Sequence, residues 1–362
     1  MDIDIARMLS DSAERWAAQH YALPQRKLML EKPGAFSAEV WSRYAEMGWL
    51  ALRLPEADGG LEADPLAIGA LMEVIGSKLL LEPILASAIV ATGLVLRLAN
   101  AEQRSRLLPR LATGEIKLAF TGAPEGCCWR EGSLHGKATA VLHGDIADVL
   151  VVAAHDELNQ QLVLSLVDAG APPLQRRSYR LVDGRGAATV EFEGTVGETL
   201  GVGADAQAAL ETALAEATVA LCAEASGIVK ALVSASCEYL KLRHQFGRAI
   251  GTNQALQHRA VEMFILQEEV AALTARAQQA LALPPRERTL AVSAAKAYVC
   301  RAARQVANEA VQMHGGVGIT DELAISHHFR RLMVNASLFG DRDRQFEQFL
   351  DSSTLRQSPG SS

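Results

Sequence analysis

The spacing of apolar residues changes twice along the chain, and this change limits the folds that the chain can adopt. Up to about residue 115, apolar residues recur three and four positions apart, as on one face of an amphipathic helix. Between residues 117 and 193 there are short stretches in which apolar and polar residues alternate, which is typical of strands. From about Asp205 to Leu338 the helical spacing returns. The chain is therefore predicted to be mainly α, with a β domain between two helical parts.

These changes in period predict three domains and a tail. The chain has 362 residues, of which 49% are hydrophobic, and this is enough for two or three packed units. The apolar pattern from Leu210 to Arg243 indicates one unusually long helix, and further long helices follow it, as in a helix bundle. The predicted parts are an N-terminal all-α domain (1–115), a middle β domain (116–202), a C-terminal four-helix bundle (203–352) and a flexible tail (353–362).

Charge and cysteine usage exclude several classes of protein. The net charge is −7 and no run of Lys and Arg stands out, so nothing favours nucleic-acid binding. Five cysteines without C-x-x-C spacing argue for reduced thiols in a cytoplasmic protein without a metal site. The chain begins without a basic, apolar leader. Its most apolar stretch, Ile84 to Leu96, is shorter than the about 20 residues of a membrane span, so we expect a buried helix and no membrane insertion.

Two segments that are far apart in sequence have the composition of an anion-binding site. In the first, a helical pattern stops at Gly247, and Arg243, Gln245 and Phe246 lie at that helix end. In the second, the glycine-rich run from Gln312 to Gly318 follows a long amphipathic stretch. Glycine lets the backbone turn tightly and present its N–H groups to anionic oxygens. Together the segments suit a dinucleotide pyrophosphate, although a glycine-rich turn after a helix is more often a simple C-cap.

The two segments resemble motifs of the acyl-CoA dehydrogenase family of flavoproteins. Arg243-His-Gln-Phe-Gly247 is similar to the family's R-x-[QT]-F-G segment, and Gln254 follows where the family has a Gln. The run Gln312 to Gly318 is similar to the family's Q-x-x-G-G-x-G turn. The family also has helices, a small β-barrel domain and a four-helix bundle in this order. The resemblance covers roughly residues 48–350, with further similar segments at Leu54 to Gly60, Leu71 to Gly76, Glu82-Pro83 and Ile146 to Val152.

This resemblance implies a function, a cofactor and partners. The family uses FAD to oxidise an acyl-CoA thioester to a trans-2-enoyl-CoA, and it generally passes electrons to a second flavoprotein. A flavin shared between subunits implies self-association as a dimer or tetramer. By resemblance, one set of residues contacts the flavin of a neighbouring subunit: Arg243, Gln245, Phe246 and Gln254. A second set holds the adenosine diphosphate part: Gln312, Gly315 and Gly316.

The family's catalytic base has no clear counterpart in this chain. The commonest base is the Glu of a Y-E-G-T segment after the last bundle helix, and the corresponding stretch here runs from Leu338 to Arg342. Phe339 takes the aromatic place and Gly340 takes the place of the Glu. Asp341 is adjacent and carries a carboxylate, so it is the first candidate for the base.

Other members of the family carry the base on the first bundle helix, one residue before an Arg. That place falls on Ala217 and Thr218 in this chain. Glu224 lies nearly two turns further along and Glu216 lies one residue away, about 100° around a helix. They are the second and third candidates for the base. Both could instead be ordinary helix carboxylates that are solvated or paired.

A second departure lies in the β domain, where the family has a T-E-P-x-x-G-S-D segment beside the flavin ring. Here Thr121 is retained, but the Pro and Gly are displaced. Trp129 could lie against the flavin or pack in the core, and the adjacent Cys127 and Cys128 are interpreted as packing residues. His314 is interpreted as either a surface histidine or a ligand contact.

Three functions remain open on these residues. The first is an acyl-CoA dehydrogenase that works alone. The second is a non-catalytic or half-site subunit that binds FAD and completes the active site of a second acyl-CoA dehydrogenase-like subunit. Two segments resemble the family's "small subunit" members, such as the small subunit of pimeloyl-CoA dehydrogenase. They are Arg177 to Gly184 and Leu338 to Asp341. The third is a helical scaffold without flavin.

Overall fold

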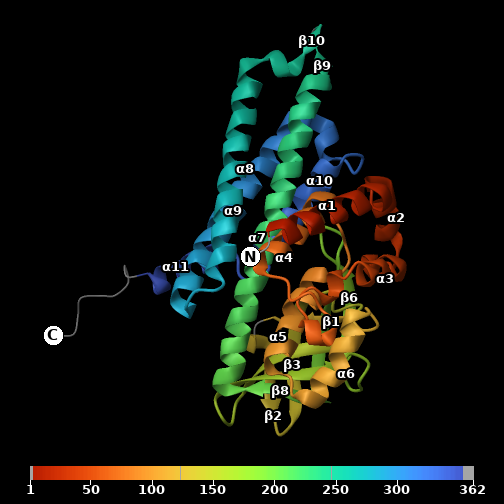
Figure 1. The fold of residues 1–362 in the computed structure, drawn as a ribbon, viewed down its shortest axis with the longest axis vertical. Coiled ribbons are helices and arrows are strands. Elements are labelled where there is room, and N and C mark those ends of the chain that lie inside the picture. The colour runs from red at the N-terminus through yellow and green to blue at the C-terminus, as the bar shows by residue number, and fades with distance from the viewer. Residues whose placement is uncertain (1–2, 123, 246, 354–362) are drawn as a thin grey trace, which may run out of the picture. The chain divides into compact units, whose positions relative to one another are not determined.

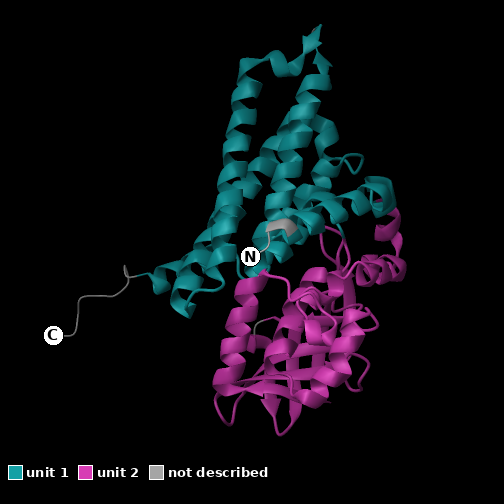
Figure 2. Cartoon of the chain, in the orientation of Figure 1, with its two compact units in different colours: residues 1–26, 65–80, 218–362 teal, residues 27–64, 81–217 magenta. Residues whose placement is uncertain are grey.

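The computed structural model describes residues 3–122, 124–245 and 247–353, so Phe246 and the predicted tail beyond residue 353 lie outside the described residues. The chain forms two compact units (Figure 2), and the division between them falls within the long helix α7 (Gly203–Leu242). The first unit comprises residues 1–26, 65–80 and 218–362, and the second comprises residues 27–64 and 81–217. The division into three domains and a tail stays a prediction.

The first unit is helical (Figure 1). Its apolar core is formed where α7, α8, α9 and α10 pack together, and it includes Ile228, Val270, Val306 and Leu332. α9 begins at Pro285, which suits the first position of a helix, and it ends where Gly315 turns at φ +63°. The helices are α1 (Ile3–His20), α4 (Pro65–Lys78), the C-terminal part of α7, α8 (Gln254–Ala280), α9 (Pro285–His314), α10 (Ala324–Ser337) and α11 (Arg342–Ser352).

The second unit is built on an eight-stranded sheet. The apolar core against the sheet includes Leu134, Leu150, Val190 and Phe192. In spatial order the strands are β6 (Gln175–Arg180), β7 (Gly186–Val196), β3 (Ser133–Leu142), β2 (Cys127–Arg130), β4 (Val149–Asp156), β5 (Gln161–Asp168) and β8 (Glu198–Val202), with β1 (Leu118–Phe120) beside β4. Pairing is antiparallel except for β1 with β4 and β2 with β4, which are parallel. The predicted fold, mainly α with a β domain, is confirmed.

Helices complete the second unit. α6 has a capping box, in which the side chains of Asn100 and Gln103 each accept a hydrogen bond from the other residue's backbone N–H. The helices are α3 (Ala38–Glu46), η4 (Ile84–Ala91), α5 (Thr92–Leu98), α6 (Ala101–Ala112) and the first part of α7, while α2 (Leu23–Glu31) crosses the division between the units.

Two strongly apolar stretches of the chain form core helices. The predicted buried helix at Ile84 is found, but its first part, η4, is wound as a π-helix before it continues as α5. α7 alone among the described helices is long and apolar enough to cross a membrane, yet 83% of its most apolar window is buried inside the structure. Its length agrees with the helix predicted from Leu210 to Arg243.

Candidate functional site

A short hairpin follows α7 and carries the first candidate segment. Strands β9 (His244–Gln245) and β10 (Arg248–Ala249) pair antiparallel between the C-terminus of α7 and the N-terminus of α8 (Figure 1). Gly247 turns there at φ +77°, a backbone conformation that favours glycine. Arg243, at the base of the hairpin, and both residues of β9 are exposed. Arg243 and Gln245 are therefore open to a ligand, whereas Phe246 lies outside the described residues.

The start of α8 lies directly after this hairpin. Arg248 donates to the side chain of Asn253 at 2.7 Å, and Asn253 makes no side-chain cap on the helix that it precedes. Gln254 is the first residue of α8 and is exposed. The N-terminus of a helix carries a partial positive charge and unsatisfied N–H groups. Together with Arg243 and Arg248, it makes this end of the first unit suitable for an anionic ligand.

The glycine-rich turn follows α9 as the short helix η7 (Gly315–Ile319). Gln312, Gly315 and Gly316 are exposed, and a Cβ atom at either glycine would meet nothing within 4 Å. The backbone is therefore open to close approach by a ligand. The N–H of Gly315, however, already bonds to the carbonyls of Gln312 and Val311 as the C-cap of α9. This N–H closes the helix, as in the C-cap alternative given above, and the role of the turn in holding a ligand stays a prediction.

Tyr239 connects the two segments within the first unit. Its backbone carbonyl accepts a hydrogen bond from the Arg243 N–H at 2.8 Å. Its ring lies 4.4 Å from the ring of His314, and its hydroxyl donates to the His314 carbonyl at 3.4 Å. His314 is buried, with Nδ1 2.7 Å from the carbonyl of Ala310. His314 is thus buried, which corrects its interpretation as a surface histidine, whereas its role as a ligand contact stays a prediction.

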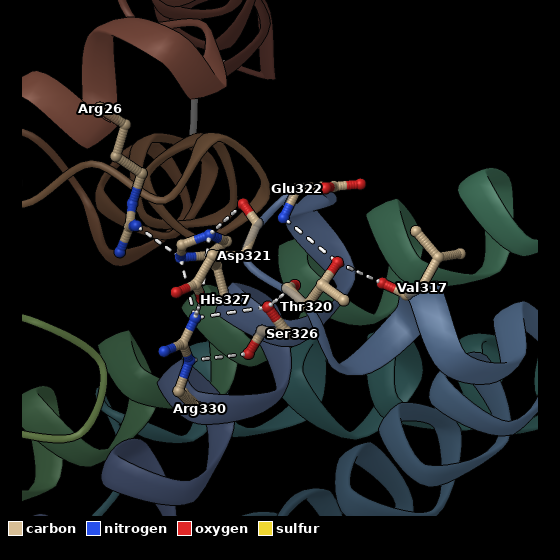
Figure 3. Close-up of polar contacts among 8 residues, drawn as sticks. All are labelled: Arg26, Val317, Thr320, Asp321, Glu322, Ser326, His327 and Arg330. Atoms are coloured by element: carbon tan, nitrogen blue, oxygen red, sulfur yellow. Dashed lines mark hydrogen bonds and ion pairs between the residues drawn. The ribbon is translucent and has the colours of Figure 1, made fainter.

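Polar side chains hold the loop that comes after the glycine-rich turn (Figure 3). The Thr320 hydroxyl donates to the Val317 carbonyl at 2.8 Å, and the Ser326 hydroxyl donates to the Thr320 carbonyl at 2.7 Å. Arg330 donates from Nε to the Ser326 carbonyl at 3.2 Å and forms an ion pair with Asp321. The loop is therefore fastened to the first turns of α10.

His327 connects the same loop to the N-terminal helices (Figure 3). Its Nδ1 lies 2.9 Å from Nη1 of Arg26, which can only donate, so the neutral imidazole carries its proton on Nε2. Nε2 lies 3.3 Å from the Asp321 carbonyl, and Arg26 also donates to the Leu79 carbonyl at 3.1 Å. Burial, together with the charge of Arg26, lowers the pKa of His327 below its ordinary value.

Asp341 is exposed, and it is the N-cap of α11. Its carboxylate accepts a hydrogen bond from the Arg344 N–H at 3.0 Å, which satisfies one of the free N–H groups of the first helical turn. A carboxylate that serves as a general base is usually buried, because burial raises its pKa, whereas Asp341 is exposed. The role of Asp341 as the base stays a prediction.

The conformation of this stretch also fits a second alignment with the family's Y-E-G-T motif. Gly340 has φ +96°, which favours glycine, and Asp341 caps a helix as a Thr could. Placing Gly340 on the Gly of the motif puts Phe339, not Gly340, at the place of the Glu. In either register the place of the base holds no carboxylate.

Glu216 lies between two arginines of the second unit. One carboxylate oxygen is 2.7 Å from Nη2 of Arg53 and the other is 2.6 Å from Nη2 of Arg97. The arginines are held in turn, since Arg53 donates to the Ile89 carbonyl and Arg97 to the Gly93 carbonyl, both at 2.8 Å. Burial lowers the pKa of Arg53 and Glu216 opposes this effect. Both oxygens of Glu216 are thus engaged in structural ion pairs.

Glu224 is fully buried and forms an ion pair with Arg331 of α10. Arg331 is also buried and donates from Nη2 to the Leu80 carbonyl at 3.2 Å. α4 crosses α7 at this point so closely that a Cβ atom at Gly76 would lie 2.1 Å from the Glu224 carbonyl oxygen. The pair therefore links α7, α10 and the chain after α4. Pairing, the structural alternative given for Glu216 and Glu224, is what the structure shows for both.

In the sheet, the residues that match the family's flavin-ring segment have structural partners. The Thr121 hydroxyl accepts a hydrogen bond from the Ala153 N–H at 3.2 Å, and Trp129 is partly buried against the core of the sheet. Burial raises the pKa of Cys127 to about 11, so this thiol stays protonated and packs as a small apolar group. Among the described residues no group of three or more His, Cys, Asp or Glu could hold a metal ion.

The sequence argument missed the residues that hold the site together. Tyr239 was not among the predicted residues, although an aromatic residue one helical turn before Arg243 is placed to pack at the same helix end. Arg331 and Arg53 were not singled out, since ion pairs between distant segments leave no local pattern in a sequence.

The family of the chain follows from comparison with known proteins. Residues 4–115 match the acyl-CoA dehydrogenase N-terminal domain, and residues 207–353 match the acyl-CoA dehydrogenase C-terminal domain. The chain therefore belongs to the acyl-CoA dehydrogenase family, as predicted. The narrower resemblance to "small subunit" members stays a prediction.

Several known proteins are similar to this chain over most of its length. The acyl-CoA dehydrogenase IpdE2 of Mycolicibacterium smegmatis is 25% identical over 94% of this chain and 96% of its own. A chain of the ChsE4-ChsE5 complex from Mycobacterium tuberculosis has the same fold, with a TM-score of 0.90 at 21% identity. The match covers 99% of this chain and 99% of that one. PigA, solved with FAD and proline, has a TM-score of 0.86 at 22% identity, over 98% of this chain and 100% of its own.

Proposed function

We propose that this chain is a FAD-binding subunit of an oligomeric acyl-CoA dehydrogenase, whose assembly converts an acyl-CoA thioester to a trans-2-enoyl-CoA. One observation carries the proposal: the exposed Arg243 hairpin and the open Gly315–Gly316 turn lie at one end of the helical unit and are connected through Tyr239 and His314. This arrangement offers a guanidinium group and an open backbone to one extended anionic ligand.

The residues present fit a flavin dinucleotide. Arg243 would hold the pyrophosphate, with Gln245 and Gln254 beside it, and Gln312 with the glycine turn would hold the adenosine diphosphate part. When bound, FAD supplies the acceptor for a hydride in this chemistry, and the protein supplies orientation and a base. The structure solved for PigA contains FAD, which supports a flavin in this fold.

We further propose that a second subunit supplies the base. Glu216 and Glu224 are both occupied by arginines, and Asp341 caps a helix at the surface. A general base needs a free carboxylate within reach of the substrate, and its pKa is usually raised by burial. The ChsE4-ChsE5 structure, a complex of two different proteins, supports such an assembly for this fold. In that role the chain would bind FAD and complete the partner's site.

Arg243→Ala is expected to weaken FAD binding about tenfold or more, because it removes a charge-assisted hydrogen bond to a phosphate. The measurement is the FAD content after dialysis of the assembly, purified after co-expression with an acyl-CoA dehydrogenase-like partner, with its mass determined at the same time. Lys241→Ala is a matched control, since Lys241 is an exposed cation at the end of α7 that forms an ion pair with Glu238. Equal retention of FAD by wild type and Arg243→Ala would count against the assignment.

A chain that works alone is the second candidate, because Asp341 lines a pocket of about 370 Å³ whose lining also includes the apolar residues Phe329 and Leu332. Asp341→Asn keeps the size of the side chain and removes its basicity. If Asp341 is the base, this change should nearly abolish exchange of the α-proton of a bound acyl-CoA in deuterated buffer while FAD stays bound. An unchanged exchange rate rules out Asp341.

A further inference from the structure

Tyr239 is joined to both candidate flavin segments, through its backbone carbonyl to Arg243 and through its ring and hydroxyl to His314. Its carbonyl receives the Arg243 N–H at 2.8 Å, and the Arg243 carbonyl in turn receives the Ile250 N–H at 2.9 Å, which closes the base of the hairpin. The place of Tyr239 on α7 therefore sets where the Arg243 segment leaves the helix.

The other side of Tyr239 faces the end of α9. Its ring lies 4.4 Å from His314 at an interplanar angle of 31°, and its hydroxyl reaches the His314 carbonyl at 3.4 Å. His314 is the last residue of α9, directly before Gly315. A movement of the Tyr239 ring would therefore act on the first residue of the glycine turn.

His314 is fixed from within its own segment. Nδ1 lies 2.7 Å from the Ala310 carbonyl one turn earlier, and a Cβ atom at Gly318 would lie 2.9 Å from the His314 Cβ. The turn thus folds back onto His314. The His314 ring, which Tyr239 contacts, is therefore a fixed part of the turn. Because of this contact, the position of the turn depends on the position of the Tyr239 ring.

We propose that Tyr239 is a positioning residue, which fixes the separation between Arg243 and the Gly315–Gly316 turn. The inference rests on the proposed function, since it concerns the same flavin site. A ligand held at two separated points binds tightly only if the distance between those points is kept, and small displacements cost affinity. Tyr239 acts through the two segments and does not itself need to touch the flavin.

The test is the dissociation constant of FAD, titrated into the apo form of the purified assembly. Tyr239→Leu removes the ring and the hydroxyl, and we expect it to weaken FAD binding about tenfold. Tyr239→Phe keeps the ring on His314 and should recover most of the affinity. Tyr298→Leu is the matched control, because Tyr298 is also a partly buried tyrosine of the first unit but bonds to Glu269, away from both segments. It should leave FAD affinity unchanged.

A double-mutant cycle separates positioning from general destabilisation. In the Tyr239→Leu background, Arg243→Ala should weaken FAD binding by less than about threefold, because a misplaced Arg243 already contributes little to FAD affinity. In the Tyr298→Leu background it should keep its full effect of about tenfold. Full additivity with Tyr239→Leu overturns the inference.

Two further outcomes complete the test. If Tyr239→Leu does not fold, His314→Leu removes the other ring of the pair and must weaken FAD binding to a similar extent. A wild-type assembly that binds no FAD at the site overturns the proposed function and this inference with it. A wild type that binds FAD, with Tyr239→Leu binding equally well, overturns this inference alone.

Discussion

Replacing Glu224 with glutamine is expected to lower the free energy of unfolding by about 3–5 kcal/mol, which is the usual cost of removing one member of a buried ion pair. Arg331 would keep its charge while 2% exposed and would lose the carboxylate that compensates it. The pair links α7 to α10, so the loss should appear in the unfolding of the first unit. Urea unfolding followed by circular dichroism measures it.

The control is Glu238→Gln, which breaks the exposed pair with Lys241 and should change stability by at most about 1 kcal/mol. The double variant Glu224→Leu with Arg331→Met removes both charges and should recover much of the loss. A loss below about 1 kcal/mol for Glu224→Gln would contradict the structural role assigned here and would return Glu224 to the candidates for the base.

The protein is expected to lose about 3 kcal/mol of stability between pH 7 and pH 4 through His328 alone. Burial lowers the pKa of His328 from 6.5 to about 4, while Nε2 lies 3.0 Å from the Ser77 carbonyl. Between these two pKa values the unfolded chain binds a proton that the folded chain does not, so stability falls as the pH falls. The difference between pKa 6.5 and about 4 corresponds to about 3 kcal/mol. His327, whose pKa is also lowered, acts in the same direction.

The measurement is the free energy of unfolding of wild type and His328→Gln from pH 7 to pH 4. Carboxylates also titrate near the acid end, so the informative quantity is the difference between the two proteins. It should shift by about 3 kcal/mol in favour of His328→Gln as the pH falls. His258→Gln, at an exposed histidine of α8, should show no such shift. Parallel pH curves for wild type and His328→Gln would contradict the assigned protonation state.

Elements with a strong apolar pattern could be predicted from sequence, whereas those without one could not. α7 and the apolar strands β4 and β5 lie within the stretches predicted to form a long helix and strands. β6, with the sequence Gln-Arg-Arg-Ser-Tyr-Arg, was missed because it is an edge strand whose side chains are mostly exposed. The π-helical winding of η4 was missed because a run that is apolar on all sides has no period to measure.

The residues of the candidate site could likewise be predicted from sequence only where they form a local motif. Arg243 and the glycine turn could be found because each is a local motif at a helix end. Whether Glu216 and Glu224 form ion pairs depends on arginines that are far away in sequence, namely Arg53, Arg97 and Arg331. Such pairs are set by tertiary packing, so the sequence left these carboxylates open as candidates for the base.

The most direct test of the half-site proposal is deuterium incorporation at the α-carbon of a bound acyl-CoA. It is measured on this chain alone, loaded with FAD, and on the assembly with an acyl-CoA dehydrogenase-like partner. We predict no exchange for the chain alone and clear exchange for the assembly, unchanged by Asp341→Asn and lost when the partner's base is replaced. Exchange by the chain alone that disappears in Asp341→Asn would contradict the proposal and would make this chain an acyl-CoA dehydrogenase in its own right.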